Sequence, residues 1–350
     1  PAITAAATIV FLFTFTSFGV VLVLGGPRLS TIETEIYRFA VVRSDLTTAA
    51  TLATVQVVMV LGVVVVSTML ERRAAVPTVG RPRPVVRSTR RWVVGNVVVM
   101  VVLLGLPVLV LVEQSLRVGE GWSLRHYGAM AHRVPQLPAP ATTALLNSLS
   151  FAVVATGIAI VVGGLTALVV VHGRGALGRV YDLGLTLPLG VSAVTIGFGM
   201  LLALDEPPLD LRTSWVIVPI AHALIGIPFV VRTLVPMLRS IDESLREAAA
   251  VLGASPGRVR RHLDLPIAGR GQAVGAGFAF AVSLGELGAA SFLPRSPDRI
   301  TAPVALFRLL GAPGDLLRGQ AMALAVVLMV LVAVAVFVIE SVRGPAEGGF

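Results

Sequence analysis

The sequence contains no cysteine and no lysine, and charged residues of any kind are scarce. Without cysteine, disulfide bonds and thiolate metal sites are excluded. All 28 basic residues are arginines, and charged residues make up only 13% of the 350 residues. Because a soluble domain carries about a quarter charged residues, a soluble globular protein of ordinary composition is excluded as well.

The chain contains long apolar segments without charged residues. Hydrophobic residues make up 55% of the chain, and the mean hydropathy is +0.89. About 20 apolar residues cross the hydrocarbon layer as a helix, which satisfies its own backbone groups there. The sequence therefore predicts an all-α polytopic membrane protein with about eight transmembrane helices. These lie near Ala5–Gly25, Leu46–Leu70, Trp92–Val112, Ala144–Val171, Leu183–Leu204, Ser214–Val231, Gln272–Leu293 and Gly319–Ile339.

The distribution of arginine predicts which loops face the cytoplasm. If the first segment runs outward, the inner loops hold 17 arginines and the outer loops the other 11 of the 28. This follows the positive-inside rule, so we interpret the net charge of +9 as a topology signal and not as a nucleic-acid site. Residues 71–91 form a predicted basic cytoplasmic linker and residues 342–350 a cytoplasmic tail. On the outer side, Val118–Ala131 and Thr301–Leu310 are amphipathic and are predicted to lie at the membrane surface.

The long inner loop, residues 239–270, predicts a helix, a turn and a second helix. Acids come early in the first helix, and its apolar residues share one face. That face consists of Ile241, Leu245, Ala248 and Leu252. Gly253 permits a left-handed stop, Ser255-Pro256 can start the second helix, and Pro266 is predicted to end it. Such an element on the inner face of a membrane protein is typical of a docking site for a soluble partner.

The residues of this loop resemble the Glu-Ala-Ala ("EAA") loop of type I ABC importer permeases. Leu263 stands where the family usually has isoleucine, which is a mild departure. The resemblance covers about Leu145–Ser341. The loop residues that carry it are Glu247, Ala248, Ala249, Gly253, Leu263 and Pro266, and the flanking matches are Asn147-Ser148-Leu149, Leu187-Pro188-Leu189-Gly190 and Ile227-Pro228-Phe229-Val230-Val231-Arg232.

This resemblance implies a type I permease fold in a multi-pass protein of the prokaryotic plasma (inner) membrane. It implies that the loop couples the solute pathway to a cytoplasmic ABC ATPase dimer, and that an extracytoplasmic solute-binding protein delivers the solute. The chain has no G-x-x-x-x-G-K-[ST] loop, so ATP is expected to bind to the partner subunit. No enzymatic activity and no cofactor are expected of this chain.

The beginning of the sequence resembles its end. Ser17-Phe18-Gly19 parallels Ser283-Leu284-Gly285, Thr31–Arg38 parallels Thr301–Arg308, and a long apolar segment follows each copy. Internal repeats are common in transporters. We therefore expect residues 1–70 to be the last two spans of a first permease domain and 92–341 a second, complete domain.

The tandem arrangement resembles the fused permeases for iron(III) and for thiamine, which makes thiamine or iron(III) the expected substrate. A chain that starts inside such a segment is expected to be truncated at its N-terminus. The missing first half of the permease, or a second copy of the chain, would then be a further partner.

Glu286 is the only ionisable side chain that the pattern places well inside a predicted span. A buried acid in a membrane protein is costly, so it should face the bundle interior or a cavity. The segment from Ser283 to Gly288 resembles an element of the molybdate, iron and thiamine permeases, and we assign Ser283 and Glu286 to the translocation path or its gate. The alternative is a structural role in which Glu286 hydrogen-bonds a kinked helix.

The other candidate residues point to no catalytic or metal site. We expect His222 to be a satisfied core polar group, and His126 and His132 have no acid or histidine at ligand spacing. No Ser/His/Asp set is expected to be arranged for catalysis. An ion-coupled secondary transporter remains the alternative, although it predicts several intramembrane charges, and a membrane-embedded enzyme would need a cluster of ligands or acid/base residues.

Overall fold

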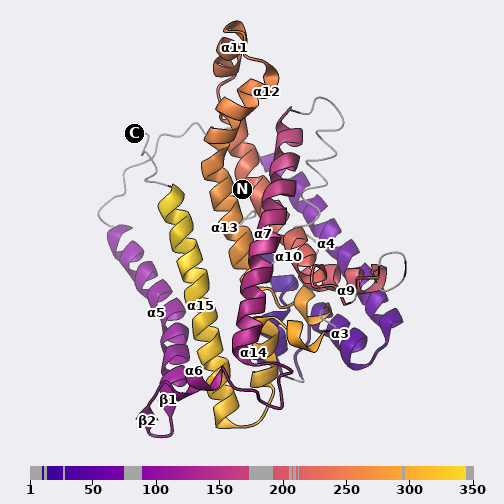
Figure 1. Cartoon of the computed structure of the whole chain (residues 1–350), viewed down its shortest axis with the longest axis vertical. Helices are drawn as coiled ribbons and strands as arrows, with labels where there is room; N and C mark the ends of the chain where they lie inside the picture. The colour runs from indigo at the N-terminus through magenta and orange to yellow at the C-terminus, as the bar shows by residue number, and fades with distance from the viewer. Residues whose placement is uncertain are drawn as a thin grey trace.

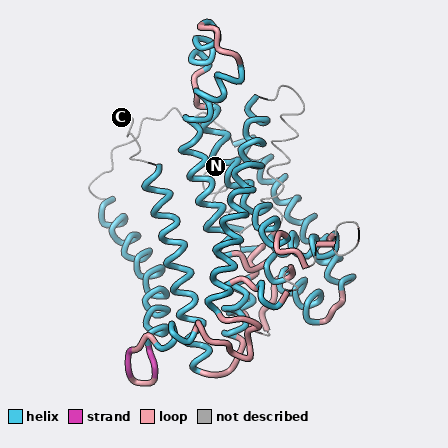
Figure 2. The backbone as a smooth tube through the Cα atoms, viewed as in Figure 1, coloured by secondary structure: helices cyan, strands magenta, loops and turns pink. Residues whose placement is uncertain are grey.

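The computed structural model describes residues 10–11, 14–26, 28–74, 89–172, 192–204, 207, 210–211, 213–293 and 296–343. These residues are almost entirely helical, with one two-stranded antiparallel hairpin (Figure 2). The elements are α2 (Gly19–Leu24), α3 (Ile32–Tyr37), the π-turn η1 (Arg38–Val42), α4 (Leu46–Ala74), α5 (Thr89–Leu116), β1 (Arg117–Val118), β2 (Gly121–Trp122), α6 (Arg125–Ala129), α7 (Ala141–His172), α9 (Ala193–Ala203), α10 (Ile217–Arg239), α11 (Glu243–Val251), α12 (Pro256–Val259), the π-turn η2 (Arg260–Asp264), α13 (Leu265–Gly285), the 3₁₀ turns η3 (Ala289–Ser291) and η4 (Pro297–Arg299), α14 (Ala302–Leu310) and α15 (Asp315–Arg343).

Six of the described helices are long and apolar enough to cross a membrane, namely α4, α5, α7, α10, α13 and α15. They correspond to six of the eight predicted spans. The first predicted span is described only from residue 10, where it holds the short α2, and the fifth is described only as the short α9. The linker residues 75–88, the motif Leu187-Pro188-Leu189-Gly190 and the tail from residue 344 lie outside the described residues.

The centre of the bundle is formed by α7, α10 and α13, which run side by side (Figure 1). Of the apolar stretch of α10, 61% is buried, whereas most residues of α5 are exposed. Glycines allow the central helices to approach closely. A Cβ on Gly163 of α7 would lie 2.9 Å from Val230 of α10, and a Cβ on Gly226 of α10 would lie 3.0 Å from Ala279 of α13.

The last helix, α15, joins this centre to the periphery. It packs against α13 and α14 on one side and against α5 on the other (Figure 1). The exposed apolar side chains of α5 and of the second half of α15 include Val101, Leu103 and Phe337, as expected for surfaces that face lipid tails. The bundle therefore has a packed centre and a lipid-facing rim.

The predicted repeat has the same order of elements in both copies. Thr31 and Thr301 each stand in extended conformation at the N-cap of a short helix, α3 or α14. The long helix that follows, α4 or α15, has 29 residues in each copy. The third predicted match differs, because Ser17 and Phe18 are non-helical whereas Ser283, Leu284 and Gly285 all lie in α13. The internal repeat stays a prediction.

The two predicted surface segments differ from each other in structure. Residues 118–131 form the β1–β2 turn and the five-residue α6, because Gly119 takes a left-handed φ of 60° and closes a tight hairpin. The Thr301–Leu310 segment is helical, but Ala302, Val304 and Leu309 of α14 are buried in a core shared with α7 and α15. Its apolar face is covered by protein and does not lie on the membrane surface.

The contact between α10 and α13 at Gly275 gives a stability prediction. A Cβ there would lie 2.5 Å from Thr233 Oγ1 and 2.8 Å from the backbone Cα of Val230, which cannot move away easily. We expect Gly275→Ala to destabilise the folded protein by about 1–3 kcal/mol through overpacking. Thermal unfolding in detergent measures this change.

The matched control is Gly157→Ala in α7, where an added Cβ meets no atom within 4 Å. This variant should be neutral or stabilising by about 0.5–1 kcal/mol, because alanine has the higher helix propensity. Equal melting temperatures for the two variants would contradict the close packing at Gly275.

Candidate functional site: a projecting loop and a buried polar cluster

The predicted docking loop projects beyond the other helices at one end of the bundle (Figure 1). Asp242 caps α11 by accepting a hydrogen bond from the backbone N–H of Ser244 at 3.0 Å. That backbone bond, with a second from the Ser244 hydroxyl, holds the pKa of Asp242 below its usual value. After α11, Gly253 takes a left-handed φ of 82°, and α12 begins at Pro256. The helix–turn–helix predicted from the sequence is confirmed.

The loop presents apolar side chains to its surroundings. Val251 and Leu252 are each 87% exposed and Leu245 is 49% exposed. Glu247 and Ala248 are exposed beside them. Solvent-exposed apolar residues on a projecting element mark an interaction surface. Sequence reasoning found Leu245 and Leu252 through their helical spacing, but it missed Val251.

Three predicted features of the loop need correction or refinement. Ile241 precedes the N-cap of α11 and is buried in the core, so it does not belong to the exposed face. Pro266 does not end a helix, because it occupies the first turn of α13, where a missing N–H is tolerated. Leu263 lies in the π-turn η2 and packs, half-buried, against the core shared by α7, α10 and α13.

An ion pair ties the loop to the central helices. Arg246 of α11 donates from Nε to Oδ1 of Asp264 at 3.0 Å and from Nη2 to the carbonyl oxygen of Leu238 at 3.2 Å. Asp264 is only 1% exposed and immediately precedes α13. Arg246 thereby connects α11 to the end of α10 and to the start of α13. Arg246 and Asp264 are separated by 18 positions in the chain, so the sequence did not indicate that they pair.

At the far end of α13, Glu286 is buried at a break in the helix. The helix ends at Gly285, and Glu286 is its C-cap in extended conformation. The two carboxylate oxygens accept hydrogen bonds from the backbone N–H groups of Ala289 and Ala290, both at 3.0 Å. The predicted span Gln272–Leu293 corresponds to the candidate membrane span Gly271–Ser291, but its helix is interrupted at Glu286. The alternative interpretation from the sequence was a structural role in which Glu286 hydrogen-bonds a kinked helix. The two hydrogen bonds to Ala289 and Ala290 are of this kind.

His222 of α10 stands between the two predicted site residues of α13. Its Nδ1 lies 2.8 Å from Ser283 Oγ, and its Nε2 lies 3.4 Å from Glu286 Oε2. Because a carboxylate only accepts hydrogen bonds, a proton on Nε2 would face Glu286 while Nδ1 accepts from the serine hydroxyl. His222 is 1% exposed, so the prediction of a buried polar group is confirmed, and its two partners are new.

The structure also brings a Ser–His–Glu set together, which the sequence did not lead us to expect. A hydrolytic serine must meet a substrate, yet Ser283 is 2% exposed and Glu286 is occupied by backbone N–H groups. Among the residues that the structure describes, no three His, Asp or Glu side chains are grouped to hold a metal ion. The arrangement suits a buried hydrogen-bonded cluster.

Residues from α3 and α4 and the N-cap of α9 complete this cluster. Glu33 of α3 is 1% exposed and accepts a hydrogen bond from Gln56 Nε2 of α4 at 2.7 Å. It also forms a hydrogen bond with Ser192, the N-cap of α9, and lies close enough to Glu286 for electrostatic repulsion. We call Glu33, Gln56, Ser192, His222, Ser283 and Glu286 the polar cluster. Glu33 lies outside the predicted spans, so sequence reasoning missed this second buried acid.

With this geometry in place, comparisons with known proteins decide the family. The model of the family "Binding-protein-dependent transport system inner membrane component" matches residues 159–341, more than half of the chain. The chain belongs to this family. It is the permease subunit of an ABC importer of type I, a multi-pass protein of the inner membrane.

Named relatives and a solved structure agree with this assignment. The "Putative 2-aminoethylphosphonate transport system permease protein PhnV" of Salmonella typhimurium is 28% identical over 230 residues, covering 66% of this chain and 86% of the relative. PhnU of the same organism and transport system is 30% identical over 218 residues, covering 58% and 75%. A bacterial ABC transporter involved in alginate import shares the fold, with a TM-score of 0.51 at 17% identity over 73% of this chain and 96% of that chain.

The Arg246–Asp264 pair gives a testable prediction for the permease. Arg246→Ala leaves the buried Asp264 carboxylate without its arginine. We expect a loss of about 3 kcal/mol of stability, at the lower end for a buried pair because Arg246 is partly exposed. Thermal unfolding should show this loss, and ATP-driven uptake in proteoliposomes should fall with it.

Two further variants separate stability from coupling. Arg246→Ala combined with Asp264→Asn removes the buried charge, so the melting temperature should recover while uptake stays low. Arg239→Ala, at an exposed position in the last turn of α10, is the matched control and should behave like the wild type. Full recovery of uptake in the double variant would show that the pair only stabilises the loop.

Proposed function

We propose that this permease imports a small organophosphonate of the 2-aminoethylphosphonate type, driven by a cytoplasmic ATPase dimer and supplied by an extracytoplasmic binding protein. The observation that carries the proposal is the family match together with the exposed coupling loop. The phosphonate class is supported by PhnV and PhnU, whose names give this substrate. Neither of these relatives is a thiamine or iron(III) permease, so the substrate expected from the tandem resemblance has no support from them.

The polar cluster is compatible with a solute that carries a positive nitrogen. Glu33 and Glu286 are two buried acids, and in their ionised form they would attract an ammonium group. Since 2-aminoethylphosphonate and thiamine both carry such a charge, the cluster alone does not discriminate between them. The relatives favour the phosphonate.

We also propose that the cluster is part of the gate and that the two copies of the repeat meet there. Glu33 and Gln56 come from the first copy, while Ser283 and Glu286 come from the second. The assignment of residues 1–70 to a first permease domain, with 92–341 as the second, is part of this proposal. Opening the path would separate these groups and expose them to the solute.

Uptake measurements test the substrate and the energy source together. The permease, reconstituted with its ATPase and binding protein, should accumulate labelled 2-aminoethylphosphonate, and excess thiamine or ferric iron should not compete. An ATPase variant that cannot hydrolyse ATP should abolish uptake, whereas collapsing ion gradients should not. Accumulation of thiamine instead would overturn the substrate, and dependence on an ion gradient would favour the secondary transporter.

Glu286→Gln tests the gate. Glutamine keeps the size of the side chain but has one carbonyl oxygen, so one of the two N–H groups at Ala289 and Ala290 loses its acceptor. Losing one hydrogen bond to a charged group should reduce ATP-driven uptake about tenfold or more. The complex should still assemble, which co-purification with the ATPase checks.

The matched control for Glu286→Gln is Glu120→Gln, which neutralises an exposed carboxylate in the hairpin turn. Its uptake should equal that of the wild type. Normal uptake by an assembled Glu286→Gln variant would falsify the gate role and leave Glu286 with the structural role alone.

A further inference from the structure

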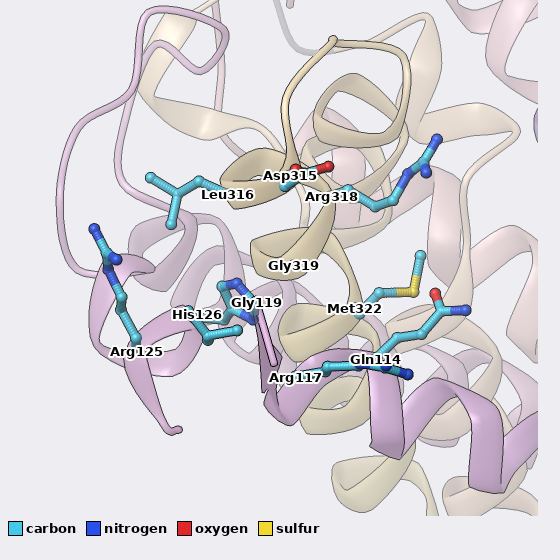
Figure 3. Close-up of a pocket in the computed structure, with 11 residues that line it drawn as sticks. Gln114, Arg117, Gly119, Arg125, His126, Asp315, Leu316, Arg318, Gly319 and Met322 are labelled. Atoms are coloured by element: carbon cyan, nitrogen blue, oxygen red, sulfur yellow. The ribbon is translucent and has the colours of Figure 1, made fainter. Parts of the chain in front are cut away.

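A cavity of about 470 Å³ opens at the end of the bundle opposite the coupling loop, between α5, α6 and α15 (Figures 1 and 3). It lies at the periphery, since most residues of α5 are exposed. It shares no residue with the polar cluster. The side chains that define its chemistry are Gln114, Arg117, Arg125, His126, Asp315 and Arg318.

The floor of the cavity is fixed by hydrogen bonds and close packing. His126 is 5% exposed, and its Nδ1 lies 3.0 Å from the carbonyl oxygen of Ser115 in α5. The same imidazole ring packs directly onto Gly319 of α15, where a larger residue would collide with it. Gln320 donates to the carbonyl oxygen of Ala129 at 2.7 Å and further ties α15 to α6. These contacts hold α6 against α15 and against the end of α5 at the cavity.

The charges around this floor favour an anion. Arg117, Arg125 and Arg318 are exposed at the cavity. Arg117 pairs with Glu113 at 3.0 Å, and Asp315 has no ion pair with an arginine among the residues that the structure describes. Three arginines against the two carboxylates leave one positive charge, which one phosphodiester anion would neutralise. Guanidinium groups bind phosphoryl oxygens in bidentate geometry.

The position of the cavity identifies the source of this anion. The apolar stretch of α5 ends at Leu116, directly before Arg117, and α15 begins at Asp315. The cavity thus stands where two lipid-facing helices leave the hydrocarbon layer, at the level of the phosphate groups. Beside it, Trp122 and Leu124 are 70% and 69% exposed, and exposed tryptophan is typical of the membrane interface.

We infer that this cavity binds the phosphodiester group of a phospholipid of the outer leaflet, with arginines on different sides of the cavity (Figure 3) supplying the positive charge and the hairpin at the interface. Such a lipid would hold α5 against α15. The inference depends on the membrane location of the permease but not on the identity of its solute. A failure of the phosphonate uptake experiment would leave it untouched.

Native mass spectrometry of the purified permease–ATPase complex tests the inference with phosphatidylglycerol as the probe. The wild type should retain the lipid, and Arg125→Ala combined with Arg318→Ala should reduce retention by about tenfold or more, as expected for lost charge-assisted hydrogen bonds. Arg133→Ala, at an exposed position of the same outer segment but outside the cavity, is the matched control and should retain the lipid fully.

A second measurement separates the lipid from a free anion and from a protein partner. Phosphatidylglycerol should raise the melting temperature of the wild type but not of the double variant, and inorganic phosphate should raise neither. Equal stabilisation by inorganic phosphate would show a free-anion site, and unchanged lipid retention with lost affinity for the binding protein would show a protein interface. Either result overturns the inference, as does equal loss of lipid in Arg133→Ala.

Discussion

The carboxylate of Glu286 accepts hydrogen bonds from two backbone N–H groups, and much of the centre of the permease depends on this contact. A helix that breaks at this depth frees backbone donors that neither water nor lipid can satisfy. With Glu286 at the end of α13, the chain can turn into η3. A Cβ on Gly197 of α9 would lie 2.5 Å from the Cα of Ala289, so α9 packs directly on that turn. His222 and Ser283 then complete the contacts of the carboxylate from the side of α10 and α13.

The helix α13 connects this break to the predicted docking loop. The 21 residues of α13 span about 30 Å, from Asp264 at one end to Glu286 at the other. Arg246 fixes α11 to Asp264, and His222 fixes α10 to Glu286. A displacement of α11 by a partner would reach the polar cluster through a rigid element that is packed between α7 and α10. The close contacts at Gly226 and Gly275 keep α10 and α13 together along this length.

The peripheral helices are surrounded mainly by lipid, whereas the central helices are surrounded by other helices. The helices α5 and α15 have few buried side chains along their apolar stretches, so lipid supplies most of their surroundings. Their outer ends are held together through His126, Gly319 and Gln320. Charged and aromatic residues concentrate where the helices reach the headgroups, which is also where the arginine-lined cavity lies.

The sequence by itself determined the class of protein and six of the described spans, and it predicted the helix–turn–helix of the docking loop. Apolar length, arginine distribution and the spacing from Glu247 to Pro266 are local patterns that the bilayer and the family impose directly. Only the tertiary structure decided how Arg246 meets Asp264, how His222 joins Ser283 to Glu286, and how Glu33 reaches the same cluster. The residues of these contacts come from different parts of the chain. Helix packing decides which polar side chains meet inside a bundle, and a periodic apolar pattern does not specify that packing. For the same reason the break at Glu286, the burial of α14 and the cavity beside α15 emerged only from the fold.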